Sequence, residues 1–147
     1  MCIGFATCTQ LEGIIRFSRR DRFFCPACLK MGFASEHSHA DRCAEAATVR
    51  RKYPDRVPVI CERHASSESS LPPLDKRKYL VPRDLTVGQF LYVVRRRMTL
   101  EPSKAIFMHT EKGRMPASTL TMSALHTEGR ASDGFLYLVV SGENAFG

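Results

Sequence analysis

The stretch Asp75–Met98, DKRKYLVPRDLTVGQFLYVVRRRM, decides the fold because it predicts a short strand, a turn and a strong helix in succession. Residues 78–81 favour a strand, and Pro82 ends that run because proline has no N–H to give to a sheet ladder. Thr86 then begins a helix, since its hydroxyl and the Gln89 side chain can form the reciprocal bonds of a capping box. The helix must pack on a sheet or on another helix, because its apolar residues recur at helical spacing, at Val87, Phe90, Leu91, Val94 and Met98.

Composition bounds the class of protein. The chain has 147 residues, of which 44% are hydrophobic, and this suits one globular domain with a real core. No window approaches the ~20 consecutive apolar residues that a membrane-spanning helix needs. Lys and Arg exceed Asp and Glu by 22 to 15, which gives a net charge of +7. This excess is too small to require nucleic acid and fits an acidic partner or an anionic membrane surface equally well.

Cysteine usage indicates the compartment. The six cysteines are Cys2, Cys8, Cys25, Cys28, Cys43 and Cys61. No secretory signal with an apolar run and a cleavage site accompanies them, and Cys61 falls in an expected core strand. The pattern favours a reducing compartment over a disulfide scaffold, so we expect a cytoplasmic protein.

Periodicity divides the chain into three parts. Residues 1–30 show no sustained periodicity, and we expect a disordered or non-native N-terminal extension, with Met31 as the natural start. Residues 31–55 are rich in helix formers and predict a helical subdomain of one or two helices. Residues 56–147 predict the rest of the domain and end in a flexible tail from Ser141 onward.

The elements of residues 56–147 indicate the fold class. Strands are predicted at 56–63, 78–81, 105–109 and 135–140, with helices from Thr86 and around 121–126. In the first strand Val57, Val59 and Cys61 share one face, while Pro58, Ile60 and Glu62 share the other. The order β-β-α-β-α-β, with helical material in front, indicates an α+β fold, a ubiquitin-like β-grasp with two N-terminal helices.

Three long strings identify a family. KYPDRVPVICER, LDKRKYLVPRDLTVGQFLYVVRRRM and DGFLYLVVSGENAFG closely resemble the autophagy-related ubiquitin-like modifiers. That family includes microtubule-associated protein light chain 3 and the GABA-receptor-associated proteins. The resemblance runs from about Phe33 to Gly147, and strings of this length are far more specific than a short motif.

The resemblance implies a non-enzymatic modifier with no cofactor and no metal. Activating and conjugating enzymes of the autophagy pathway would pass the Gly147 carboxylate through thioesters to phosphatidylethanolamine. A glycine suits this passage because a residue without Cβ threads a narrow active site. A cysteine protease would process the precursor or remove the lipid, although no residue follows Gly147 here. The modifier would reach the autophagosome membrane only after lipidation, and we expect no nucleic-acid partner.

The resemblance also implies a docking surface for cargo receptors. Their aromatic-x-x-aliphatic peptides, flanked by acids, would add as a strand to an open edge at residues 78–81. The aromatic residue would enter a first pocket lined by Glu45, Val49, Pro58, Ile60, Lys78, Leu80 and Phe135. The aliphatic residue would enter a second pocket lined by Tyr79, Val81, Pro82, Leu85, Phe90 and Val93. Lys76 and Lys78, with Arg56 nearby, would attract the acids.

The sequence departs from the family pattern in several places. Ser38-His39 stands where a Pro-Phe pair is usual, which leaves open how the first helices dock and how Glu45 reaches the first pocket. Ala117 replaces the second of two consecutive prolines and Arg114 replaces an aliphatic residue, both in an expected loop. Residues 1–30 have no family counterpart.

Other classes of function remain as alternatives. Cys25 and Cys28 have the spacing of a zinc knuckle, which His37, His39 or Cys43 would complete, although a single C-x-x-C is a weak motif. An enzyme would use Cys61 with His64, or His109 and His126 with Glu111, but no nucleophile motif surrounds either set. An adaptor that binds peptides without being lipidated is the remaining alternative. The basic runs RRK, KRK and RRR lack stacking aromatics, so we treat nucleic-acid binding as incidental.

Overall fold

The computed structural model describes residues 15–16, 32–64 and 71–142. In chain order its elements are β1 (Ile15–Arg16), α1 (Phe33–Glu36), α2 (His39–Lys52), β2 (Arg56–Arg63), β3 (Lys78–Pro82), α3 (Val87–Arg97), β4 (Ile106–Thr110), α4 (Met122–Gly129) and β5 (Leu136–Gly142). Among the described residues, no helix has both the length and the apolar character needed to cross a bilayer. The expected extension at residues 1–30 lies outside the described residues except for β1.

The sheet has the strand order β1-β3-β2-β5-β4. Its centre is a parallel pair, β2 and β5, in which Val59 lies opposite Leu136 and Cys61 opposite Leu138. Antiparallel pairs flank this centre on both sides, β2 with β3 and β4 with β5. A first hairpin, a crossing helix and a last strand that returns to the middle of the sheet confirm the predicted α+β β-grasp.

The helix α3 covers one face of the sheet and builds the larger core. Its capping box forms as predicted, with the Gln89 N–H donating to Thr86 Oγ1 at 3.3 Å and the Thr86 N–H donating to Gln89 Oε1 at 3.0 Å. Phe90 and Val94 are fully buried against the β2 face that carries Val57, Val59 and Cys61. The apolar stripe read from the sequence is therefore the contact between α3 and the sheet.

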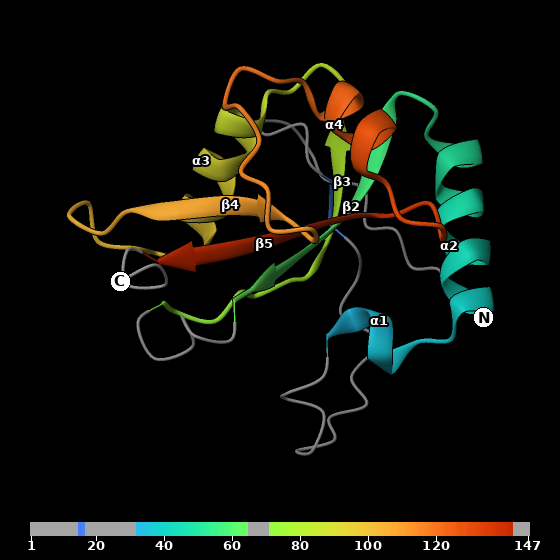
Figure 1. Cartoon of the computed structure of the whole chain (residues 1–147), viewed down its shortest axis with the longest axis horizontal. Helices are drawn as coiled ribbons and strands as arrows, with labels where there is room; N and C mark the ends of the chain where they lie inside the picture. Colours follow the sequence, from blue (N-terminus) through green and yellow to red (C-terminus); the bar gives the residue numbers. More distant parts are fainter. Residues whose placement is uncertain (1–14, 17–31, 65–70, 143–147) are drawn as a thin grey trace.

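The helices α1 and α2 cover the opposite face, so the sheet lies between α2 and α3 (Figure 1). A smaller core of Phe33, Ala46, Ile60, Phe135 and Tyr137 fills this side. The turn before β5 brings α2 close, because Gly134 has φ +92° and a Cβ added to it would lie 3.2 Å from the Cβ of Ala46. Only glycine combines that backbone conformation with so short an approach.

The C-terminal strand is longer than the sequence predicted. Ser141 and Gly142, expected to begin the flexible tail, pair with Phe107 and Ile106 and are buried in β5. Small polar residues resemble a tail in sequence, but here the neighbouring strand β4 supplies partners for their backbone groups. The expectation of a tail is wrong for these two residues, and residues 143–147 lie outside the described part.

Candidate functional site

Most of the predicted first pocket comes together between β2, β3 and α2. The β2–β3 register places Leu80 opposite Pro58 and Lys78 opposite Ile60. Lys78 Nζ donates to Glu45 Oε1 at 2.8 Å and lies 5.1 Å from the centre of the Phe33 ring. This contact brings the Glu45 side of the pocket into place despite the departure at Ser38-His39.

Burial distinguishes the floor of the first pocket from its rim. Val49, Ile60, Leu80 and Phe135 are each 0% exposed, and Pro58 is also buried. The side chains of Lys78 and Glu45 stay 17% and 19% exposed. The rim is thus an ion pair over an apolar floor, and the predicted pocket is closed in this structure because that floor has no exposed surface.

The second predicted pocket lies on the other face of β3, because side chains alternate along a strand. Tyr79 and Val81 are buried there, and the Tyr79 ring meets the Phe90 ring edge-on at 5.5 Å. Leu85 and Val93 are half-buried against the same cluster, and Pro82 is half-buried at the end of β3. The residues of the two predicted pockets therefore lie mainly on opposite faces of the sheet, next to the same strand β3.

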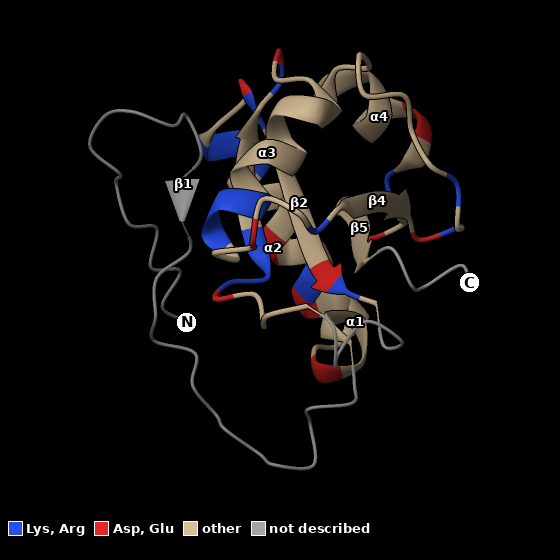
Figure 2. Cartoon of the chain, turned by 90° about the vertical axis from the view of Figure 1, so that its left-hand side faces the viewer, with Lys and Arg blue, Asp and Glu red and all other residues tan. Residues whose placement is uncertain are grey.

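The basic residues expected to attract acids lie in different settings. Lys76 precedes β3 and is half-buried, whereas Arg56 begins β2 opposite Pro82. Arg56 Nε lies 3.9 Å from Asp55 Oδ2. Further basic residues occupy the last turns of α2 and α3, which belong to the blue segments of Figure 2.

The edge of β3 is occupied, contrary to the prediction of an open edge. β1 pairs antiparallel with it, Ile15 opposite Leu80 and Arg16 opposite Tyr79. A strand edge offers one row of N–H and C=O groups, so β1 takes those that an added peptide would use. No pattern in residues 1–30 predicted this pairing, because they carry no strand periodicity.

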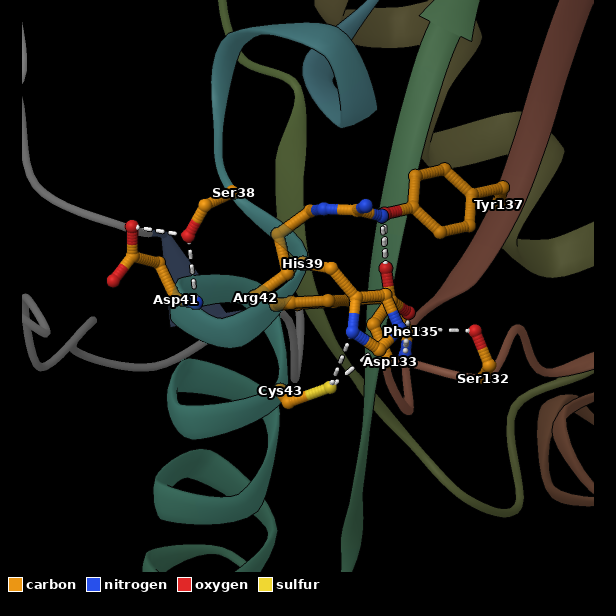
Figure 3. A network of polar contacts seen from close by, with 9 residues as sticks. All are labelled: Ser38, His39, Asp41, Arg42, Cys43, Ser132, Asp133, Phe135 and Tyr137. Carbon is orange, nitrogen blue, oxygen red and sulfur yellow. Dashed lines mark hydrogen bonds and ion pairs between the residues drawn. The ribbon is translucent and has the colours of Figure 1, made fainter.

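Sequence reasoning missed the polar network that docks α2. Arg42 binds Asp133 and donates to the hydroxyl of Tyr137 at 3.0 Å (Figure 3). The Tyr137 hydroxyl donates to Asp133 Oδ2 at 2.6 Å, and the Phe135 N–H donates to Asp133 Oδ1 at 2.9 Å. Burial first, and the Asp133 hydrogen bond next, raise the pKa of Tyr137, so the hydroxyl stays protonated as a donor.

Polar contacts dock α2 although the usual Pro-Phe pair is replaced by Ser38-His39. Ser38 caps α2 by accepting from the Asp41 N–H at 3.1 Å, and His39 Nε2 hydrogen bonds with Ser132 Oγ at 3.1 Å. The helix is thus held by polar contacts to the turn before β5. An arginine at position 42 and an aspartate at 133 were visible in the sequence, but they lie 91 positions apart.

The alternative catalytic sets find no support in the described residues. Burial, and then the Glu62 charge, raises the pKa of the Cys61 thiol to about 12, which keeps it an inert core group. His109 Nε2 hydrogen bonds with Ser141 Oγ at 3.1 Å, whereas His126 Nε2 bonds the Gly134 carbonyl at 3.0 Å. Each imidazole thus has its own structural partner, and burial is the largest cause lowering the pKa of both.

The structure does not test the two cysteines on which the zinc alternative depends. Cys25 and Cys28 lie outside the described residues. Within the described ranges no group of three or more His, Cys, Asp or Glu side chains is arranged to hold a metal ion. Cys43 Sγ lies 3.5 Å from His39 Nδ1 on consecutive turns of α2.

The sequence profile of the family described as "Autophagy protein Atg8 ubiquitin like" matches residues 41–147. The chain belongs to the Atg8 family of ubiquitin-like autophagy proteins. It is 51% identical over 119 residues to "Autophagy-related protein 8" of Mycosarcoma maydis, a match that covers 81% of this chain and 98% of that protein. It is 54% identical over 115 residues to "Autophagy-related protein 8d" of Arabidopsis thaliana, with 78% of this chain and 93% of the relative covered.

A solved structure of the Atg8 family agrees with the fold. The crystal structure of Trypanosoma brucei ATG8 is 41% identical to this chain and superposes with a TM-score of 0.71. The match covers 78% of this chain and 97% of that one. The first 40 residues precede the Atg8 profile match, so β1 is an addition to the family domain.

Proposed function

We propose that this Atg8-family chain is a modifier conjugated through Gly147 to phosphatidylethanolamine, and that it acts in autophagosome formation. The observation that carries the proposal is the Atg8 profile match, which continues to Gly147 itself. Gly147 lies outside the described residues, five positions after the end of β5 at Gly142. The proposal assigns the membrane association to the lipid.

In this proposal the chain supplies a carboxylate and its partners supply the catalysis. The activating enzyme uses ATP to convert the Gly147 carboxylate into a thioester, and the acyl group passes to a thiol of the conjugating enzyme. The lipid amine then attacks this second thioester, forms an amide and releases the thiol. A cysteine protease exposes the glycine in precursors and removes the lipid. The buried thiol of Cys61 and the partnered imidazoles of His109 and His126 support this division of roles for the described residues.

The second part of the proposal is receptor docking at β3. The first and second pockets defined above lie on opposite faces of one strand. The aromatic and the aliphatic residue of the motif are three positions apart, so in an added strand they would point to opposite faces and each would meet one pocket. Lys78 is paired with Glu45 at the rim, so Lys76 and Arg56 are the cations that we expect acidic flanking residues to approach. A peptide that pairs with Leu80 and Tyr79 must displace β1, which holds the same positions.

Reconstitution tests the conjugation. The whole chain is incubated with cognate activating and conjugating enzymes, ATP and phosphatidylethanolamine liposomes, and its intact mass is measured. We expect a mass gain of one lipid, and we expect Gly147→Ala to abolish it, because an added methyl group obstructs the narrow catalytic sites. Gly129→Ala is the matched control, since a Cβ there meets Leu136 at an ordinary 3.7 Å.

Two outcomes would contradict the conjugation proposal. The chain stays unmodified although a relative is lipidated under the same conditions, or Gly147→Ala is lipidated as well as the unchanged chain. The first outcome favours the alternative of an adaptor that binds peptides without lipid. The second shows that another residue carries the lipid.

A further inference from the structure

A cleft lined by arginines lies at one end of α2, outside the docking edge, the name we give to β3 (Lys78–Pro82) with the two predicted pockets beside it. Five arginines surround a cavity of about 460 Å³, namely Arg50, Arg51, Arg56, Arg83 and Arg130. They come from the last turn of α2, the start of β2, the turn after β3 and the end of α4. We call this surface the arginine cleft. Its size is that of a site for a small molecule.

The charges of the arginine cleft are mostly uncompensated. No residue that lines it is acidic, and within the described residues Arg50, Arg51 and Arg130 take part in no ion pair. Elsewhere basic side chains face carboxylates, as Arg42 faces Asp133 and Lys78 faces Glu45. Gathering like charges without a counter-charge is unfavourable. A bound anion would remove that cost.

Helix dipoles explain only part of the cluster. Arg50 and Arg51 lie in the last turn of α2 and Arg130 follows α4, where cations are favourable. Arg56 and Arg83 belong to a strand and a turn, so no helix end accounts for them. The cleft therefore brings together more positive charge than the fold requires.

The guanidinium of Arg83 is held in place without being neutralised. Its Nη2 and Nε donate to Ser123 Oγ at 3.1 and 3.3 Å, and its Nη1 donates to the Pro54 carbonyl at 3.4 Å. Both acceptors are uncharged. The guanidinium keeps its full positive charge, and although Ser123 takes its Nε–Nη2 side, the outward N–H groups of Nη1 and Nη2 remain for a phosphate.

The pKa of His126 depends on the charges of the arginine cleft. Its imidazole is 9% exposed in the wall of the cavity and bonds the Gly134 carbonyl. Burial lowers the pKa of His126 most, and the charges of Arg50, Arg130 and Arg83 lower it further. Three arginines from three segments thus act on one buried ring, which places their charges around a common space.

We propose that the arginine cleft binds a small, multiply phosphorylated anion, of the kind that an inositol polyphosphate presents either free or as a lipid headgroup. Several phosphates are needed because a single negative charge does not offset five guanidinium groups. A second cavity of about 520 Å³ shares Arg50 and Arg130 with the first, but the Asp133 carboxylate also lines it, so we expect the phosphates in the first cavity. The site is independent of both the conjugation and the peptide docking proposed above.

Calorimetry on the whole chain with inositol hexakisphosphate, at a salt concentration of about 0.15 M, tests the site. We expect one ligand per chain, and we expect Arg83→Glu to weaken binding about tenfold or more, because it removes a charge-assisted contact and adds repulsion. Arg96→Glu is the matched control, since it makes the same change of net charge on an exposed position of α3. Equal losses in the two variants, or no binding at all, would overturn the proposal.

A second measurement tests the location of the ligand. In an NMR titration, saturating ligand should raise the pKa of His126 in the unchanged chain, because the bound anion offsets the nearby arginine charges. The same ligand should leave the pKa of His109 where it was, because no cleft arginine contributes to its shift. An unchanged His126 in a chain that binds the ligand would place the ligand elsewhere and overturn the proposal.

Vesicles then distinguish the two sources of the phosphates. Phosphatidylcholine vesicles with a bisphosphorylated phosphatidylinositol are compared with vesicles that carry the same charge as phosphatidylserine. Preference for the phosphoinositide, lost in Arg83→Glu, would assign a lipid headgroup to the cleft. Binding of soluble inositol hexakisphosphate without any vesicle preference would assign a free ligand. Equal binding to both vesicles without binding of the soluble ligand would contradict the site.

Discussion

The docking edge at β3 and the arginine cleft are two surfaces built on the same helix by opposite means. The docking edge uses Val49 and Glu45 of α2, hides its apolar floor completely and has β1 paired with two of its residues, Tyr79 and Leu80. The arginine cleft uses Arg50 and Arg51 of α2, which are exposed and take part in no ion pair within the described residues.

The difference teaches how each surface must recognise a partner. Binding at the docking edge exchanges one set of apolar and backbone contacts for another, so its affinity depends on fit and is weakly sensitive to salt. Binding at the arginine cleft begins with charges already in place, so it should be fast and should weaken steeply with salt. Variants that separate these two behaviours test the comparison.

We expect the largest change in stability from the Arg42–Asp133–Tyr137 network, because it holds α2 and both surfaces use that helix. Asp133→Ala leaves Arg42, the Tyr137 hydroxyl and the Phe135 N–H without their buried acceptor. We expect the free energy of unfolding to fall by about 3–5 kcal/mol, as when one partner of a buried ion pair is removed. Urea denaturation measures it, and both peptide and anion binding should weaken together.

The control for Asp133→Ala is an ion pair in a more exposed position. Arg77 pairs with Glu36 at 2.6 Å, and its side chain is 42% exposed. Arg77→Ala should therefore change the free energy of unfolding by about 1 kcal/mol or less. Similar losses in the two variants would show that the Arg42–Asp133–Tyr137 network does not hold α2.

The second prediction concerns peptide binding at the docking edge alone. Leu80→Ala should weaken an acid-flanked aromatic-x-x-aliphatic peptide about tenfold, because the floor of the first pocket loses its central side chain, a loss of about 1.4 kcal/mol. It should leave lipidation and inositol hexakisphosphate binding unchanged. Fluorescence anisotropy with a labelled peptide measures the affinity.

Stability must be separated from binding in this experiment, because Leu80 is 0% exposed and its truncation also costs about 2–5 kcal/mol of folding free energy. Leu138→Ala removes a leucine that is 1% exposed in β5 and matches that cost away from the edge. If Leu138→Ala weakens the peptide as much as Leu80→Ala, the assignment of the docking edge is wrong.

The smallest effect concerns β1. Arg16→Pro removes an N–H and fixes φ, which should release β1 from Tyr79 and Leu80. We expect peptide affinity to rise about fivefold, since one or two hydrogen bonds at about 0.5–1.5 kcal/mol each no longer compete. Ala6→Pro changes the same extension outside β1 and should have no effect. Unchanged affinity in Arg16→Pro would mean that β1 does not oppose docking.

Sequence reasoning succeeded where periodicity and family strings carried the information. The alternation in β2 correctly separated the two cores, and the capping box at Thr86 and Gln89 forms as predicted. The residues of the two predicted pockets came from the family resemblance, and whether a peptide binds there stays a prediction.

The sequence could not predict contacts between distant segments. The bond between Arg42 and Asp133, the pairing of Arg16 with Tyr79 and the meeting of Arg83 with Ser123 all join residues far apart in the chain. No local sequence pattern predicts these contacts. A single charged residue in a surface helix or turn gives the same sequence signal whether its side chain is solvated or paired. Ser141 and Gly142 were mistaken for a tail for the same reason, because their partners lie in β4.

The central claim is that a receptor peptide adds to β3 between the two pockets. The most direct measurement is an NMR titration of the isotope-labelled whole chain with an acid-flanked aromatic-x-x-aliphatic peptide. We predict that the largest shifts fall on the amides of Lys78–Pro82 and around Phe90 and Val49, and that the β1 amides move as that strand leaves. Shifts confined to the arginine cleft, or spread over the surface with β3 and β1 unchanged, would contradict the account.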